Sequence, residues 1–104
     1  MNKIILDFTG IKSYWELHEY FKSTFHLPEQ YGRNMDALWD CLYYSFEFPT
    51  TIVLKNISAI PNEMNEEAEI MLELFRDLQR EDKKVSVVID SSGDDSSDIS
   101  DYLI

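Results

Sequence analysis

The sequence predicts an α/β domain, in which a small, mostly parallel sheet of three strands is covered by about three to four helices. Three short apolar segments at residues 3–8, 51–54 and 85–89 carry this prediction, because such runs are typical of strands buried on both faces. Amphipathic helical patterns separate them in the order β-α-α-β-α-β. Strands that alternate with helices pair in parallel through right-handed crossovers.

Local signals define the first strand and the first helix. Residues 3–8 form the strand, which we expect to be buried on both faces. Ser13 then begins a helix, Glu16 three residues later makes a capping box, and Pro28 ends the helix before it. The apolar residues of this helix recur near helical spacing: Trp15, Leu17, Tyr20, Phe21 and Phe25.

A loop and a second helix follow. Residues 27–33 read as a loop in which Gly32 allows a sharp turn, and Asn34 is suited to cap the next helix. That helix is predicted over residues 35–45, before Pro49 ends the segment. Its apolar stripe consists of Met35, Leu38 and Leu42.

The second half of the chain contributes two strands and one long helix. Residues 51–54, which are β-branched up to residue 53 and then apolar, predict the second strand. After a short helical turn within residues 56–61, the long helix should run from about residue 62 or 63 to residue 80, with acids in its first turns as the helix dipole favours. Residues 85–89 predict the third strand.

The composition changes after residue 90. Residues 91–104 are polar, acidic and of low complexity, which leaves too little apolar surface for independent folding. We therefore divide the chain into a domain over residues 1–90 and an acidic Ser/Asp-rich tail over residues 91–104. The aspartates of the tail do not follow the spacing of an EF-hand loop, so we expect a solvated tail and no metal site.

The charge balance limits the kinds of partner that the chain can bind. Twenty acidic and nine basic residues give 20 − 9 = 11 net negative charges at pH 7. Such a field repels nucleic acid and anionic membranes, and it speeds encounter with a basic protein. The same acidity can serve solubility alone, so the charge does not by itself choose between these roles.

The sequence also predicts where the protein resides. Cys41 is the one cysteine, so no internal disulfide can form. The first residues lack the apolar run of a signal peptide, and no stretch approaches the roughly 20 apolar residues of a membrane helix. We expect a cytoplasmic protein that is monomeric apart from its partner.

An acidic pair in the second predicted helix is the strongest candidate for a binding site. Asp36 and Asp40 are four residues apart and share a face, where like charges cost roughly 0.2–0.5 kcal/mol. The helix dipole favours Asp36 in the first turn but does not favour Asp40. Four aromatic residues are close in sequence: Tyr31, Trp39, Tyr43 and Tyr44. This pattern indicates either an interface with a hot spot or a solvated acidic face with scattered aromatics.

The segment around this pair resembles the barstar family of intracellular ribonuclease inhibitors. The matching residues are Leu27, Pro28, Glu29, Tyr31, Gly32, Asn34, Asp36, Ala37, Leu38, Trp39, Asp40, Cys41 and Leu42, followed by Glu47 and Pro49. A weaker similarity extends over about residues 3–90. It includes Leu17-His18, Phe75-Arg76, Glu81 and the strand at residues 85–89.

The resemblance implies a mechanism of inhibition. The second helix and the preceding loop would enter the active site of a ribonuclease, where Asp40 would take the place of the RNA phosphate and Asp36 would pair with neighbouring cations. The backbone of Gly32 and the side chain of Asn34 would shape the docking loop, and Trp39 would lie on the interface side. Acids are attracted to a preformed cationic site because buried, unpaired cations are costly.

Several positions depart from the family pattern. Gln30 stands where the family has a tyrosine, and Tyr43-Tyr44-Ser45 replaces a threonine, a glycine and a tryptophan. Asp77 replaces a glutamate, so its carboxylate is one methylene shorter. The largest change in bulk is at Tyr44. Barnase is the ribonuclease that the name-giving member of the family inhibits. These changes favour a different nuclease as the target, one with a related cationic cleft.

The sequence therefore predicts a stoichiometric inhibitor of the antitoxin or immunity type, which binds a basic ribonuclease or toxin nuclease one to one and needs no cofactor. The predicted contact residues are Gln30, Tyr31, Gly32, Asn34, Asp36, Trp39, Asp40, Tyr43, Tyr44 and Asp77. The alternative is an acidic module that binds a basic partner without blocking catalysis.

An enzyme is a less suitable interpretation. Paired carboxylates act as general acid and base only where their environments separate their pKa values, and nothing near Asp36 and Asp40 in the sequence does so. His18 is expected to be packed or solvated. Cys41 reads as a small core residue, because no motif places a histidine beside it.

Overall fold

Three parallel strands form one sheet, in the spatial order β1-β2-β3, in the computed structural model of residues 2–90. These strands are β1 (Asn2–Asp7), β2 (Thr50–Lys55) and β3 (Val85–Asp90). Each strand pairs in register with the next, so that Ile4, Ile52 and Val87 lie in one row across the sheet.

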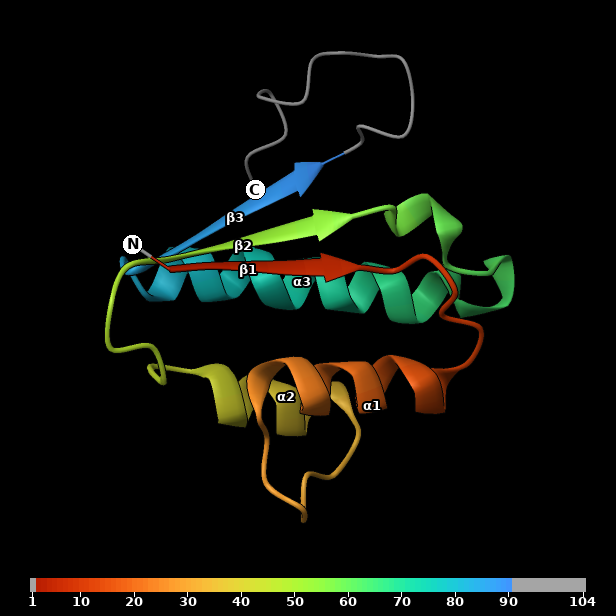
Figure 1. The fold of residues 1–104 in the computed structure, drawn as a ribbon, viewed down its shortest axis with the longest axis horizontal. Helices are drawn as coiled ribbons and strands as arrows, with labels where there is room; N and C mark the ends of the chain where they lie inside the picture. Colours follow the sequence, from red (N-terminus) through yellow and green to blue (C-terminus); the bar gives the residue numbers. More distant parts are fainter. Residues whose placement is uncertain (1, 91–104) are drawn as a thin grey trace.

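The helices lie on the same side of the sheet (Figure 1). They are α1 (Tyr14–Phe25), α2 (Met35–Leu42) and α3 (Asn65–Glu81), with two short 3₁₀ turns, η1 (Ile57–Ala59) and η2 (Asn62–Met64), between β2 and α3. The predicted fold class and element order are confirmed. The structure places the start of α3 at Asn65, two to three residues later than predicted, because residues 62–64 form the separate 3₁₀ turn.

The prediction that all three strands are buried on both faces is wrong for β1 and β3. Within residues 2–90 the helices cover one face, so side chains alternate between buried and exposed along an edge strand. In β1, Leu6 is fully buried whereas Ile5 is 48% exposed, and in β3 Ser86 is exposed. The central strand β2 is shielded by both neighbours, and both Ile52 and Val53 are buried there.

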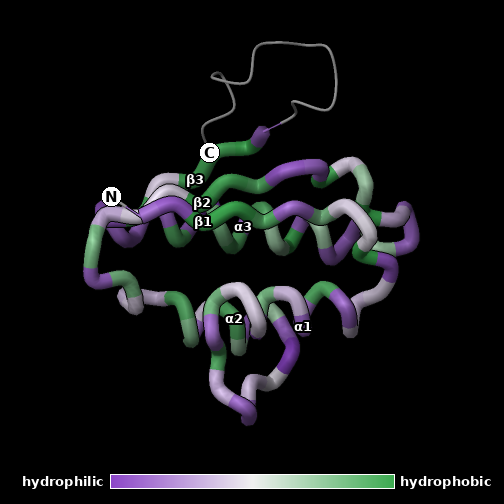
Figure 2. The backbone as a smooth tube through the Cα atoms, viewed as in Figure 1, coloured by the Kyte–Doolittle hydropathy of each residue, from purple (hydrophilic) through white to green (hydrophobic). Residues whose placement is uncertain are grey.

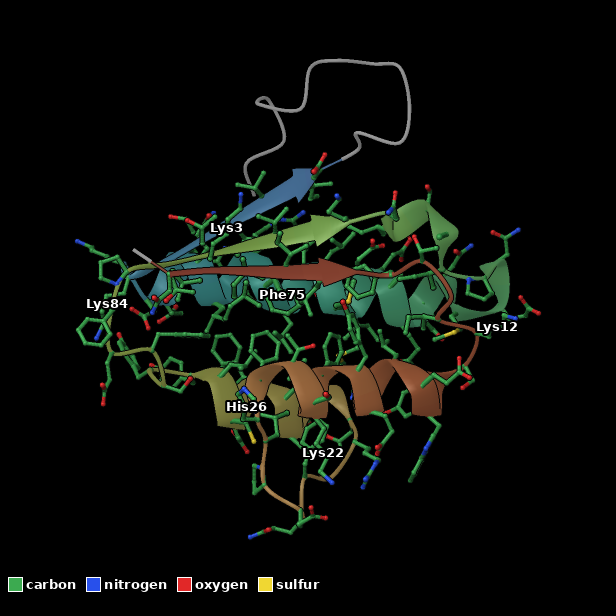
Figure 3. All side chains as sticks on the ribbon, in the orientation of Figure 1. Lys3, Lys12, Lys22, His26, Phe75 and Lys84 are labelled. Carbon is green, nitrogen blue, oxygen red and sulfur yellow. The ribbon has the colours of Figure 1, made fainter. Side chains whose placement is uncertain are left out.

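The core fills the space between the sheet and the helices. Phe75 of α3 is fully buried there and makes an edge-on contact with Phe21 of α1, at 6.3 Å between ring centroids; Figure 3 shows Phe75 between the sheet and α1. Leu6, Phe8 and Leu54 from the sheet side are also fully buried. This packing holds α1 and α3 in a fixed relation to the sheet.

The helix α1 begins as predicted, but one of its aromatic residues faces outward. The Ser13 side chain accepts a hydrogen bond from the Glu16 N–H at 3.1 Å. The Glu16 carboxylate accepts from the Lys12 N–H at 2.8 Å, one residue before the position expected in a capping box. Trp15, predicted among the apolar residues of the helix, is 59% exposed.

The helix α2 is three residues shorter than predicted. It ends at Leu42 because the backbone becomes extended at Tyr43, with ψ of 119°, and the next residue, Tyr44, has a left-handed φ of 53°. A glycine adopts this conformation without cost, whereas other residues are strained in it. Tyr44 therefore holds a backbone conformation that a glycine at this position would adopt without cost.

The loop between α1 and α2 projects from the end of the molecule opposite the sheet and is largely hydrophilic (Figure 2). Within residues 2–90 no helix is both long and apolar enough to cross a membrane. The acidic tail over residues 91–104, with the expectation that it is solvated and holds no metal, lies outside the described residues.

Candidate partner-binding site

The two carboxylates of the predicted hot spot are exposed side by side on α2. Asn34 begins this helix, since its side chain accepts a hydrogen bond from the Ala37 N–H at 2.8 Å. Asp36 and Asp40 lie in successive turns and both are exposed. Among the described residues neither carboxylate has a salt-bridge partner. The face is thus free to pair with cations from outside the protein.

A shallow hollow lies between α2 and α3, and of the acidic pair Asp36 lines it whereas Asp40 does not. Its volume is about 190 Å³, and its lining residues are Met35, Asp36, Trp39, Ile70, Glu73, Leu74 and Asp77. The structure therefore brings Asp77 of α3 together with Asp36 and Trp39 of α2, from which it is distant in sequence. Asp77 also forms an ion pair with Arg80 of its own helix. Ile70 and Glu73 were missed in the sequence, because only the packing of α2 on α3 places them here.

Three aromatic rings extend from this hollow to the end of α2. Trp39 stacks on Tyr43 with ring centroids 5.2 Å apart, and Tyr43 meets Tyr44 edge-on at 4.4 Å. The Tyr44 hydroxyl donates a hydrogen bond to the Glu81 carbonyl at 2.9 Å, which helps to hold the strained backbone. Tyr43 and Tyr44 are 41% and 57% exposed, so they form an exposed aromatic surface at the end of α2.

Tyr31 lies in the core, which corrects the prediction that its side chain forms part of the contact surface. The side chain is 3% exposed, and its hydroxyl lies 2.6 Å from Nδ1 of His18, a fully buried residue of α1. The rings of Tyr14 and Phe21 pack around His18. Tyr31 therefore anchors the loop to α1, and His18 is a packed residue.

The buried environment of this anchor keeps both of its groups neutral. Burial, and secondarily the positive charge of Arg33, lowers the pKa of His18 from 6.5 to about 4. Burial also raises the pKa of Tyr31 above its ordinary value. Nε2 of His18 has no hydrogen-bond partner among the described residues, so a proton added there would bring a charge into an apolar setting.

The sharp turn of the loop was predicted at Gly32, but the structure places the left-handed backbone one residue later. Gln30 and Gly32 are both exposed. The residue with a left-handed backbone is Arg33, with φ of 54°, whereas Gly32 has no such φ. A Cβ atom placed on Gly32 would lie 3.4 Å from Cβ of Ala37 and from Nδ2 of Asn34. The fold of the free protein therefore does not require glycine at position 32.

Cys41 lines a second hollow, of about 560 Å³, at the end of α1. The sequence had given no histidine near this thiol, but His26 lines the same hollow. The remaining lining residues are Ile4, Thr24, Phe25, Leu27, Pro28, Leu42, Ser45 and Phe46. None of them is a carboxylate that could orient an imidazole as a general base.

Comparisons with known proteins agree with this architecture. The family model described as "Barstar (barnase inhibitor)" matches residues 1–91. A protein of Bacillus subtilis (strain 168), named "Putative ribonuclease inhibitor YrdF", is 39% identical over 81 residues, which cover 78% of this chain and 89% of that protein. Both support a ribonuclease-inhibitor-like role. Because the family model spans nearly all of the sequence, the chain belongs to the barstar family.

Proposed function

We propose that this protein is a stoichiometric inhibitor of a basic ribonuclease or toxin nuclease, and that α2 and the loop before it plug the cationic active site of the target. Asp40 occupies the phosphate position, and Asp36 pairs with neighbouring cations. Trp39 and Asp77 extend the contact across the hollow, while Gln30, Gly32 and Asn34 contribute from the loop. The protein itself performs no chemistry.

One observation carries this proposal: two exposed carboxylates in successive turns of α2 have no cation beside them within the described residues. Like charges at this spacing destabilise an isolated helix, so the arrangement is best explained by a partner that supplies the cations. The excess of negative charge over the whole chain would speed the encounter with a basic partner.

The exposed tyrosines at the end of α2 support a preference of the inhibitor for particular nucleases. Tyr43 and Tyr44 stand where the family pattern has small residues, and both rings are held by stacking or by a hydrogen bond. A target with a bulky surface at this position would clash. We therefore propose that these two residues select a nuclease with space or an apolar contact beside its cationic cleft.

Calorimetric titration against barnase and several other basic microbial ribonucleases or toxin nuclease domains tests the proposal, with RNA cleavage followed in parallel. We expect one-to-one binding that abolishes cleavage, weakens as salt rises and competes with a nucleotide analogue. Binding that leaves cleavage intact would instead support the acidic module that does not block catalysis.

Replacing Gly32 by alanine separates binding from folding. We expect the stability to change by less than about 1 kcal/mol, because the backbone of Gly32 is ordinary and the added Cβ has room. Affinity should fall by about tenfold or more if the target approaches this backbone closely. Thermal denaturation and calorimetry measure the two quantities.

Gly10→Ala is the matched control for this experiment. Gly10 has φ of 89°, so alanine is strained there and should lower the stability, while its affinity for the target should not change because Gly10 lies outside the proposed site. Equal loss of affinity in the two variants would contradict the role of Gly32.

A further inference from the structure

We propose that Arg33 is a positioning residue, which together with Glu19 clamps the docking loop onto α1 before the partner arrives. This inference rests on the proposed function, because it concerns how the same binding surface is prepared. Arg33 lies between Gly32 and Asn34, the two loop residues assigned to the contact surface. Its own side chain turns toward α1 and is 25% exposed.

The guanidinium group of Arg33 is held by three groups at once. Nε donates a hydrogen bond to Oε2 of Glu19 at 2.6 Å, and Nη2 lies 2.5 Å from the same oxygen. Nη1 donates a hydrogen bond to the Tyr31 carbonyl at 3.3 Å, which links two residues of the loop to each other. The planar group also stacks over the ring of Trp15, 4.4 Å from its centroid. Only a guanidinium can make all these contacts together.

The backbone of Arg33 is fastened at the same place. The Tyr14 hydroxyl donates a hydrogen bond to the Arg33 carbonyl at 2.7 Å. The left-handed φ of 54° is uncommon for a residue with a side chain, and such a conformation persists only where the surroundings hold it. The contacts with Tyr14, Trp15 and Glu19 explain how the loop keeps this conformation. They also explain why Trp15 is an exposed residue of α1.

A second ion pair links the same helix to the same loop and provides a matched control. Nζ of Lys22 lies 3.2 Å from Oε1 of Glu29, whose side chain is 94% exposed; Figure 3 shows Lys22 at the loop end of the molecule. The Lys22 side chain is 18% exposed, but the carboxylate that it meets is solvated, so we expect the pair to contribute little. It lacks the stacking and backbone contacts of Arg33, so its loss should leave the loop in place.

A purely electrostatic effect and a positioning role predict opposite changes in affinity for the Arg33→Gln variant. Arg33→Gln makes the net charge one unit more negative, so electrostatic attraction alone would tighten binding to a basic partner. Glu19→Gln makes the net charge one unit less negative and would weaken binding on the same ground. A clamp instead predicts that both variants weaken binding, because each one loosens the loop that must be ordered on binding.

The first measurement uses the free full-length protein. Amide hydrogen exchange of Tyr31, whose N–H donates a hydrogen bond to the Pro28 carbonyl at 3.0 Å within the loop, should be faster in Arg33→Gln and in Glu19→Gln than in the unmodified protein, by about fivefold or more, whereas exchange in β2 should change much less. Lys22→Gln and Glu29→Gln, which make the same changes in net charge, should leave the loop exchange unaltered. Unchanged loop exchange in the two clamp variants would overturn the proposal, whatever the partner is.

The second measurement uses a ribonuclease that the unmodified protein inhibits. We expect both single variants to bind about fivefold or more weakly, and the double variant to bind no more weakly than the weaker single variant, since the two residues act as one unit. Arg33→Lys should restore only part of the affinity. Tighter binding by Arg33→Gln would refute the clamp. If the unmodified protein inhibited no ribonuclease, the proposed function would be refuted. The hydrogen exchange of the free protein would then decide whether the clamp exists.

Discussion

Asp40→Ala should abolish tight binding to the target nuclease, with a loss on the order of several kcal/mol. Central acids at such interfaces, including that of barstar itself, are known to have effects of this size. Part of the loss reflects the cations of the target, which remain buried without a counter-charge when the carboxylate is removed. The side chain of Asp40 is exposed and has no salt-bridge partner among the described residues, so the free protein should remain as stable as before.

Calorimetry with the unmodified protein and three variants measures this effect. Asp40→Asn keeps the shape and removes the charge, and should lose most of the affinity. Glu69→Ala removes an exposed acid of α3 that does not line the hollow, and should lower affinity by less than about 1 kcal/mol through the overall field alone. Near-normal affinity in Asp40→Ala, or equal losses in Asp40→Ala and Glu69→Ala, would contradict the central role of Asp40.

The stability of the protein should fall by up to about 3 kcal/mol between pH 6.5 and pH 4 through His18 alone. The pKa of His18 is lowered from 6.5 to about 4 by burial and by the charge of Arg33. The unfolded chain therefore takes up a proton on this residue below pH 6.5, whereas the folded protein does so only near pH 4. Because the unfolded state binds more protons in this interval, stability is complete above pH 6.5 and is lost as the pH falls.

Urea denaturation at pH 7 and pH 4.5 tests this prediction in the unmodified protein and in His18→Gln. The variant should be less stable at pH 7, since it loses a packed aromatic ring, but its stability should depend less on pH than that of the unmodified protein. Tyr31→Phe should keep most of the pH dependence, because burial is the first cause of the lowered pKa. The same pH dependence with and without His18 would show that this residue does not titrate as described.

The difference between local and long-range determinants is clearest at the ends of the helices. Ser13 and Asn34 were predicted as caps and act as caps, since a capping hydrogen bond joins residues only three positions apart. The end of α2 was predicted three residues too late. The chain leaves the helix at Tyr43 and turns left-handed at Tyr44, whose hydroxyl donates a hydrogen bond to the carbonyl of Glu81, a residue far away in sequence.

The exposure of the aromatic residues shows a second limit of local patterns. Helical spacing assigned Trp15 to the core, and proximity to Asp36 assigned Tyr31 to the surface. The structure reverses both assignments, because Trp15 stacks on Arg33 outside the core and Tyr31 fills a space next to His18. Amphipathic spacing gives the direction of a side chain on its helix, but not whether another segment covers it.

The sequence by itself determined the α/β class, the order of the elements, the acidic face of α2 and the resemblance to the barstar family, because all of these depend on composition and on spacing within one segment. Only the tertiary structure decided that one sheet face is left without a helix within residues 2–90, that Asp77 joins Asp36 and Trp39 at one hollow, and that Arg33 is held by Glu19. These features arise where segments distant in the chain are brought together by burial of a shared core. Burial is non-directional, so the pattern of residues within one segment does not specify which other segments pack against it.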